Sequence, residues 1–305
     1  MRLPIFPYYA FGLALLLSTH GIRKKSLSLS GGFTAFIVGF GIMAGGLKTF
    51  GVSLIVFYLL GSRATKYGKK RKVGYEEGYQ EAGYRSGWQV LCNSLSALIA
   101  ASVWNATYVP GSVQAHILSG LVKPEGRAYT PNGWCVVGDD KWSRGLVFAT
   151  LGHFACCLGD TLASELGILS KSEPRLITNL KVVPRGTNGG MSVEGTVWSI
   201  VGGGVMGTVM GACLLLENKA CGVGSLTALV GWGAFAGGFG SLVDSLLGAT
   251  VQQTRYSGDR HLILQDDTRT NGRDIRVVSG WNILTNNQVN LVSSIITAIV
   301  LLASA

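Results

Sequence analysis

Residues 146–169 read LVFATLGHFACCLGDTLASELGIL, and Asp160 and Glu165 are the only charged side chains in this segment. About 20 apolar residues suffice for a helix to cross the ~30 Å hydrocarbon core of a bilayer. The segment is therefore predicted to span a membrane. A carboxylate inside a bilayer costs about 2.5–3.5 kcal/mol even on lenient insertion scales, so both acids need a partner or a task.

Seven other segments are apolar, and most of them reach a similar length. The predicted spans lie near residues 3–20, 29–45, 47–60, 88–108, 146–169, 192–216, 223–247 and 283–304. The third segment is short, so the second and third either cross fully or form a re-entrant hairpin, and seven or nine spans remain alternatives. The prediction is an all-α polytopic membrane protein in one domain, residues 1–305, with a bundle of about eight transmembrane helices.

The composition agrees with helices that pack closely in a bilayer. Hydrophobic residues make up 48% of the chain and charged residues 14%, whereas about 25% of a soluble domain is charged. Glycine occurs 44 times, about twice its usual share. In the sixth predicted span Gly203, Gly207 and Gly211 recur every four residues, as Gly233 and Gly237 do in the seventh. Such spacing predicts helix faces that allow backbones to approach.

Cysteines and the N-terminus indicate neither a zinc site nor a targeting segment. The six cysteines form no CxxC pair and have no zinc-like spacing to histidine. Most lie in or beside apolar segments, so they are expected to be small core residues. The first apolar stretch directly follows Arg2 without a cleavage site, which favours a retained span over a signal peptide. No plastid or mitochondrial transit peptide is recognised.

Basic residues predict the orientation. Most of the 26 Lys and Arg residues lie in four connecting segments. These segments are residues 23–25, 63–85, 171–185 and 255–276. With eight spans, all four lie on one side, which the positive-inside rule makes cytosolic, and both termini are then lumenal. The endoplasmic reticulum or another endomembrane is the expected location.

Four acidic residues lie in or beside the predicted spans: Asp160, Glu165, Glu194 and Asp244. By the eight-span count, all four are near the cytosolic ends of spans five, six and seven. Few basic residues occur inside the spans, so a cation site is favoured over simple ion pairing. Asp160 and Glu165 lie about 140° apart on an ideal helix, and they share one ion only if the helix breaks there.

Further polar motifs lie near the same face. Residues 184–195 read PRGTNGGMSVEG, a glycine loop that opens a helix. Free backbone N–H groups and the positive helix end suit a phosphate, although no Walker A sequence occurs. The ordinary alternative is a turn with Ser192 as the helix cap. Arg85, Gln89 and Asn93 form a polar stripe at the start of the fourth span.

The motifs together resemble the transmembrane protein 19 family, which is also called domain of unknown function 92. This family includes the plant phytyl-phosphate kinases. The matching strings are GSRATK at 61–66, RSGWQVLCN at 85–93, GDTLASELG at 159–167, PRGTNGGMSVEG at 184–195, GSLVDSLLGATVQ at 240–252 and NNQVNL at 286–291. The resemblance implies a membrane-embedded prenyl-phosphate kinase. Such an enzyme transfers a phosphoryl group from a nucleoside triphosphate, expected to be CTP, to a prenyl monophosphate such as phytyl or geranylgeranyl phosphate.

SVEG at 192–195 and LVDS at 242–245 more distantly resemble dolichol kinases and CDP-diacylglycerol synthases. Those families have lysines ahead of the glutamate, where this chain has TNGG at 187–190, so the nucleotide stays open. The plant kinases carry plastid transit peptides and this chain shows none, which leaves the prenyl chain open as well.

The residues fit phosphoryl transfer, which depends on positioning and on Mg²⁺ that bridges phosphates and carboxylates. Asp160, Glu165 and Asp244 are the candidate Mg²⁺ ligands, and Glu194 is a ligand or orienting group. The candidate nucleotide- and phosphate-binding residues are Arg63, Lys66, Arg85, Arg185, Gly186, Thr187, Asn188, Gly189, Gly190 and Ser192. Other polar residues expected there are Gln89, Asn93, Ser245, Gln252, Asn286, Asn287 and Asn290. The prenyl tail is expected in the bilayer between the glycine-faced helices.

Two other functions remain alternatives. A transporter for an anionic or cation-coupled solute also uses broken helices that meet at carboxylates and amides. A cytidylyltransferase acting on a lipid phosphate would release pyrophosphate instead of a nucleoside diphosphate. The expected partners are the lipid bilayer, a prenyl monophosphate and a nucleoside triphosphate, without nucleic acid, and the sequence leaves open whether the chain forms a homo-oligomer.

Overall fold

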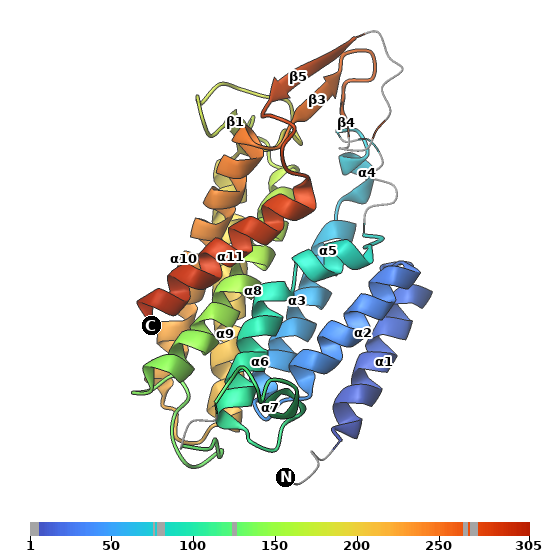
Figure 1. Ribbon diagram of the computed structural model, residues 1–305. Coiled ribbons are helices and arrows are strands. Elements are labelled where there is room, and N and C mark those ends of the chain that lie inside the picture. The colour runs from blue at the N-terminus through green and yellow to red at the C-terminus, as the bar shows by residue number, and fades with distance from the viewer. Residues whose placement is uncertain (1–5, 76, 78–82, 124–126, 265–267, 269–273) are drawn as a thin grey trace.

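A computed structural model describes residues 6–75, 77, 83–123, 127–264, 268 and 274–305. Residues 3–5 of the first predicted span and 269–273 of the last basic segment lie outside these described residues. The helices are α1 (Tyr8–Arg23), α2 (Leu29–Met43), α3 (Lys48–Lys66), α4 (Lys69–Lys72), α5 (Gly87–Cys92), α6 (Leu95–Tyr108), α7 (Val113–Ile117), α8 (Lys141–Gly167), α9 (Val193–Glu217), α10 (Val223–Thr250) and α11 (Asn286–Ser304). The long helices run side by side as a bundle (Figure 1).

Four helices of the described chain, α8 to α11, are long and apolar enough to cross a membrane. Helix α2 is apolar but shorter. The fourth predicted span is broken into α5 and α6 at Asn93 and Ser94, whose side chains donate to the carbonyl oxygens of Gln89 and Val90 at 2.8 Å each. The polytopic helical bundle is therefore confirmed, whereas the count of eight spans stays a prediction.

Glycines bring three of these helices into backbone contact, which confirms the predicted packing faces. A Cβ atom at Gly203 of α9 would lie 2.8 Å from Cα of Gly237 in α10. At Gly159 of α8 it would lie 2.7 Å from the carbonyl oxygen of Ser199 and 2.8 Å from Cα of Gly237. A side chain at either glycine would clash with the neighbouring helix, so this close contact requires glycine. The glycine faces are closed against each other, so the place expected for a prenyl tail is filled by backbone.

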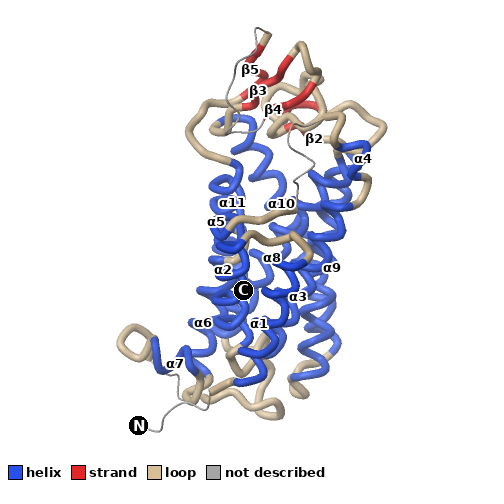
Figure 2. Tube along the Cα trace, turned by 90° about the vertical axis from the view of Figure 1, so that its right-hand side faces the viewer, coloured by secondary structure: helices blue, strands red, loops and turns tan. Residues whose placement is uncertain are grey.

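The all-α prediction missed two small antiparallel sheets. Strands β1 (Arg175–Leu176) and β2 (Gly190–Met191) form one of them. The other has the order β4-β3-β5, with β3 (Thr254–Ser257) between β4 (Leu262–Leu264) and β5 (Ile275–Ser279). Both views place the strands at one end of the bundle and α7 at the opposite end (Figures 1 and 2). Strands this short carry too few alternating residues for a recognisable period-two pattern.

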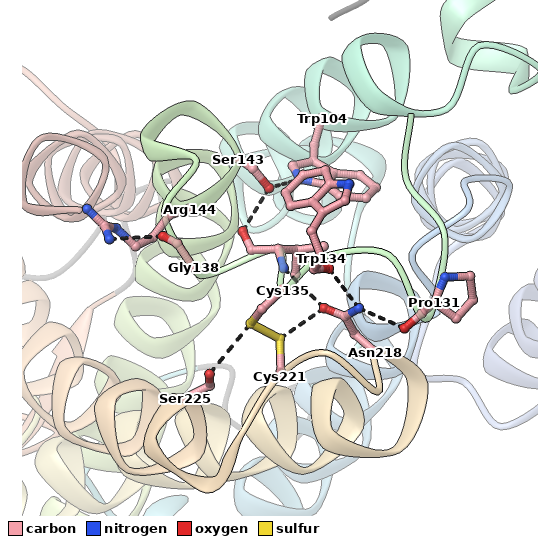
Figure 3. The surroundings of a disulfide bond; sticks show 11 residues. Trp104, Pro131, Trp134, Cys135, Gly138, Ser143, Arg144, Asn218, Cys221 and Ser225 are labelled. Atoms are coloured by element: carbon pink, nitrogen blue, oxygen red, sulfur yellow. Dashed lines mark hydrogen bonds between the residues drawn. A yellow bond between two sulfur atoms is a disulfide. The ribbon is translucent and has the colours of Figure 1, made fainter. Parts of the chain in front are cut away.

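A disulfide between Cys135 and Cys221 departs from the expectation that the cysteines are simply small core residues. It joins the segment ahead of α8 to the turn between α9 and α10 (Figure 3). Asn218 supports it, because its Nδ2 donates to the carbonyl oxygens of Pro131 and Trp134 at 3.0 Å each. The sequence gives no signal for this pairing, because the two cysteines are 86 residues apart.

The disulfide predicts a measurable loss of stability when both cysteines are replaced. A bond across 86 residues restricts the unfolded chain strongly, and removal of such a bond typically lowers the free energy of unfolding by about 2–4 kcal/mol. The double variant Cys135→Ser/Cys221→Ser should therefore unfold at a lower temperature in detergent than the wild type. Cys213→Ser is the matched control, because Cys213 is a free cysteine. Alkylation of both residues in freshly isolated, untreated membranes would contradict the bond.

Candidate functional site

A cavity of about 1050 Å³ lies among α1, α2, α3, α5, α8, α10, the start of α11 and the loop ahead of α9. Most of the predicted site residues line it. They are Arg85, Gln89, Asn93, Asp160, Glu165, Arg185, Gly186, Thr187, Asn188, Gly189, Gly190, Ser192, Asp244, Ser245, Gln252, Asn286, Asn287 and Asn290. The structure thus brings together residues that lie far apart in the sequence. Three predicted residues, Arg63, Lys66 and Glu194, are not part of this lining.

Asp160 of α8 and Asp244 of α10 both line the cavity, close enough to interact electrostatically. Ser241 donates to Asp160 Oδ1 at 3.4 Å, and Ser241 and Asp244 are three residues apart on one face of α10. From α11, Ser293 donates to Asp244 Oδ2 at 2.9 Å. The backbone contact at Gly159 fixes the position of Asp160 next to it. Two half-buried carboxylates held in this way form an acceptor-rich pair suited to a divalent cation.

Glu165 has a partner that sequence reasoning missed. Lys72 Nζ donates to Glu165 Oε2 at 2.7 Å and to the carbonyl oxygen of Ala64 at 3.1 Å, and the Lys72 side chain is 0% exposed. In the sequence Lys72 ends the run KKRK at 69–72 and is indistinguishable from a solvated basic loop. Breaking a buried pair of this kind typically costs about 3–5 kcal/mol. Glu165 is thus held by an ion pair within the protein.

The three predicted metal ligands do not form one cluster. In the part of the chain that the structure describes, no group of three His, Cys, Asp or Glu side chains is placed to hold a metal ion. Asp160 and Asp244 remain as a neighbouring pair in the cavity lining, while Glu165 is bound to Lys72. Glu194 lies elsewhere, with its Oε2 accepting from Ser172 Oγ at 2.6 Å.

Arg85 brings a positive charge to the cavity. Its backbone is fixed to the α1–α2 connection, since its N–H donates to the Ser26 carbonyl at 3.1 Å and its carbonyl accepts from Ser28 at 3.0 Å. Its Nη1 donates to Ser62 Oγ at 2.9 Å, and its Cζ lies 5.9 Å from the centre of the Tyr58 ring. Burial lowers the pKa of the Arg85 guanidinium, and electrostatic interactions with Tyr58 and Glu165 oppose that shift.

The loop ahead of α9 is built on two left-handed glycines. Gly186 has φ 85° and Gly189 has φ 74°, a conformation that side chains disfavour. A Cβ atom at Gly189 would also lie 2.7 Å from the backbone nitrogen of Ala249 in α10. The loop therefore depends on glycine in order to dock on α10, irrespective of any ligand.

Several polar groups expected to bind phosphate already have partners. The N–H of Asn188 donates to Thr254 Oγ1 at 3.1 Å, and that of Gly190 donates to the Thr187 carbonyl at 2.9 Å. Ser192 Oγ accepts from the Gly195 N–H at 3.1 Å, so Ser192 caps α9. The cap predicted as the ordinary alternative is confirmed, and the loop as a phosphate cradle stays a prediction.

Arg185, Arg63 and Lys66 differ from Arg85 in their surroundings. Arg185 Nη1 donates to the Ile168 carbonyl at 3.0 Å and also to the Ser170 carbonyl, so its guanidinium covers the carbonyl end of α8. Arg63 and Lys66 are exposed in the last turn of α3. Sequence reasoning identified these charges but not that Arg85 and Arg185 line the cavity whereas Arg63 and Lys66 do not.

Comparison with known proteins places the chain in a family. A family model described as integral membrane protein DUF92 matches residues 12–298. Protein PGR of Arabidopsis thaliana is 34% identical over 298 residues, which is 95% of this chain and 93% of that protein. Protein VTE6, chloroplastic, also of A. thaliana, is 30% identical over 119 residues, 38% of this chain and 32% of that protein. No solved structure matches. The chain therefore belongs to the DUF92 family of integral membrane proteins, as its motifs indicated.

Proposed function

We propose that this protein is a membrane-embedded prenyl-phosphate kinase that uses a nucleoside triphosphate, expected to be CTP, and requires Mg²⁺. The main support is one cavity that combines the neighbouring carboxylates Asp160 and Asp244 with the Arg85 guanidinium and also reaches an apolar region between α1, α2 and α3. A lipid phosphate has matching parts, an anionic head and an apolar tail. The resemblance to plant phytyl-phosphate kinases supports the same reaction.

Asp160 and Asp244 fit the way in which proteins hold Mg²⁺. This ion is usually bound by one or two carboxylates, with substrate phosphates and water in its other positions, so a neighbouring pair suffices. When bound, Mg²⁺ neutralises charge on the phosphates and orients them. Ser241 and Ser293 hold the two carboxylates in position by donating to Asp160 and Asp244. Glu165 stays paired with Lys72 and fixes α4 against α8.

The proposed reaction needs no catalytic base. An oxygen of the prenyl monophosphate attacks the terminal phosphorus of the nucleotide, a new P–O bond forms, and the bond to the nucleoside diphosphate breaks. Arg85 would bind oxygens of the acceptor phosphate, because guanidinium forms strong charge-assisted hydrogen bonds with phosphate. The half-buried site would limit water that competes as the acceptor.

Transport remains a second candidate because the helix break between α5 and α6 is a feature of many transporters. The break places Gln89 and Asn93 on the cavity wall. Cytidylyl transfer is the other alternative and would use the same carboxylate pair. The three functions differ in their products: a nucleoside diphosphate for the kinase, pyrophosphate for the cytidylyltransferase and neither for the transporter.

The disulfide supports the predicted orientation. Disulfides persist in oxidising compartments and are rare in the cytosol. Cys135 and Cys221 lie close to the starts of α8 and α10, at the end of the bundle opposite the strands. The basic run 69–72 and the carboxylates lie toward the other ends of α3, α8 and α10. We therefore place the Cys135–Cys221 end in the lumen of an endomembrane, such as the endoplasmic reticulum, and the polar end of the cavity toward the cytosol.

A direct assay tests the proposed function. Purified protein in lipid nanodiscs should convert phytyl or geranylgeranyl phosphate to the diphosphate when labelled CTP and Mg²⁺ are present, and it should release CDP in equal amount. Removal of Mg²⁺ with EDTA should stop turnover, and added Mg²⁺ should restore it, because phosphate charge is otherwise unneutralised. Release of pyrophosphate would identify the cytidylyltransferase, and no nucleotide turnover with CTP or ATP would favour the transporter.

Replacement of either neighbouring carboxylate should nearly abolish turnover. Asp160→Asn and Asp244→Asn keep the shape of each side chain but remove its negative charge, so kcat/KM should fall more than about 100-fold if electrostatic stabilisation dominates. Asp259→Asn is the matched control, because Asp259 is exposed and lies outside the cavity lining. It should retain activity close to that of the wild type. Active Asp160→Asn and Asp244→Asn proteins would disprove the metal assignment.

Labelling of single added cysteines tests the orientation. Lys70 and Asn132 are exposed residues at the two ends of the bundle. In sealed endomembrane vesicles with the cytosolic face outward, a membrane-impermeant maleimide should label Lys70→Cys directly. It should label Asn132→Cys only after the vesicles are permeabilised. The reverse pattern would place the polar end of the cavity in the lumen.

A further inference from the structure

We propose that the apolar arm of the cavity holds the hydrocarbon tail of the lipid phosphate and sets the length of tail that is accepted. The apolar arm is defined here by Ala14 and Leu17 of α1, Val38, Gly39 and Met43 of α2, and Leu54 of α3. This inference rests on the proposed function and deepens it. It replaces the glycine faces of α9 and α10 as the site of the tail.

The lining of the cavity changes in character along α3. Gly61 and Thr65 lie near the Arg85 end, where a Cβ atom at Gly61 would be 3.9 Å from Arg85 Nη2. Toward the start of the helix the lining residues become Phe57, Ile55 and Leu54. An amphipathic ligand whose phosphate lies at Arg85 would therefore extend its tail along α3 toward Leu54.

The distance from the Arg85 end of the cavity to the far end of the arm follows from the rise of the helices. The start of α2 lies at the polar end, because Gly31 packs directly against the Arg85 carbonyl oxygen. From Gly31 to Met43, at 1.5 Å per residue, α2 advances about 18 Å. From Thr65 back to Leu54, α3 covers about 16 Å by the same rule. One leaflet of the ~30 Å hydrocarbon core is ~15 Å deep, so the arm matches a single tail that reaches about the bilayer midplane.

The deep end of the arm is closed by contacts among α1, α2 and α3. A Cβ atom at Gly39 would lie 3.4 Å from Met43 Cε and 3.6 Å from Ala14 Cβ, both ordinary van der Waals distances. From α3, Gly51 also approaches the Met43 side chain, with a Cβ position 2.7 Å from Met43 Cγ. Gly39 thus borders both the cavity and its closed end, and a larger side chain there would shorten the arm.

The backbone conformation at Gly39 is compatible with a side chain. Its φ is not in the left-handed region, and leucine favours helices more than glycine does. Gly12 of α1 is a matched control, since a Cβ atom there meets nothing within 4 Å and Gly12 does not line the cavity. Gly39→Leu and Gly12→Leu therefore make the same chemical change inside and outside the arm.

The experiment compares kcat/KM of the two variants and the wild type for farnesyl and geranylgeranyl phosphates. Gly39→Leu should lower the ratio of geranylgeranyl to farnesyl turnover at least about 10-fold, since misfits of this size in apolar pockets have effects of that order. Gly12→Leu should leave the ratio unchanged. Met43→Ala, which deepens the arm, should shift the ratio toward the longer chain. An unchanged ratio in an active Gly39→Leu protein would overturn the inference while leaving the kinase intact.

A photoreactive prenyl phosphate with a diazirine at the end of its tail gives a second measurement that needs no turnover. Crosslinks to α1, α2 or α3 near Met43 that decline in Gly39→Leu would support the arm even if the wild type proves inactive as a kinase. Crosslinks confined to α9 and α10, or no specific crosslinking, would overturn it. The two measurements thus separate a failure of the arm from a failure of the kinase reaction.

Discussion

The close contact of α8, α9 and α10 at Gly159, Gly203 and Gly237 is the constraint on which the rest of the structure depends. Within a bilayer there is little hydrophobic drive for helices to associate, so stability comes from packing and hydrogen bonds. The absence of side chains at these glycines lets the backbones meet. This contact sets the distance between α8 and α10, and thereby the distance between the carboxylates of Asp160 and Asp244.

Within this arrangement of α8, α9 and α10, each acidic side chain has a distinct environment. Asp160 and Asp244 accept hydrogen bonds from serines and retain capacity for a cation, whereas Glu165 is neutralised by the buried Lys72. At the opposite end, Glu217 accepts from the backbone N–H groups of Lys48 and Thr49 and caps α3. Carboxylates that look equivalent in the sequence thus divide into those that fix helices, Glu165 and Glu217, and those that line the cavity with serine donors, Asp160 and Asp244.

The sequence could predict the features that depend on local patterns. Long apolar segments indicated the helical bundle, glycine spacing indicated the packed faces, and most of the polar motifs proved to line one cavity. The features it could not predict depend on partners distant in the chain. Lys72 meets Glu165 across 93 residues, and Cys135 meets Cys221 across 86 residues. The contacts of Arg185 with backbone carbonyl groups could not be predicted either, because such contacts leave no trace in a sequence.

The arrangement of charge and apolar surface within one cavity also narrows the class of substrate. An inorganic ion or a soluble nucleotide alone would use only the polar end, which Arg85, Asp160 and Asp244 line, and would leave the arm beside Val38 and Leu54 unexplained. A neutral lipid would make no use of the two carboxylates and the guanidinium at the polar end. In our proposal, a phosphate head bound through Arg85 and through Mg²⁺ at the carboxylates would use the polar end, and one apolar tail would use the arm. The charged groups at the polar end and the apolar arm are thus two independent features of the cavity that support our proposal of a lipid phosphate as the substrate.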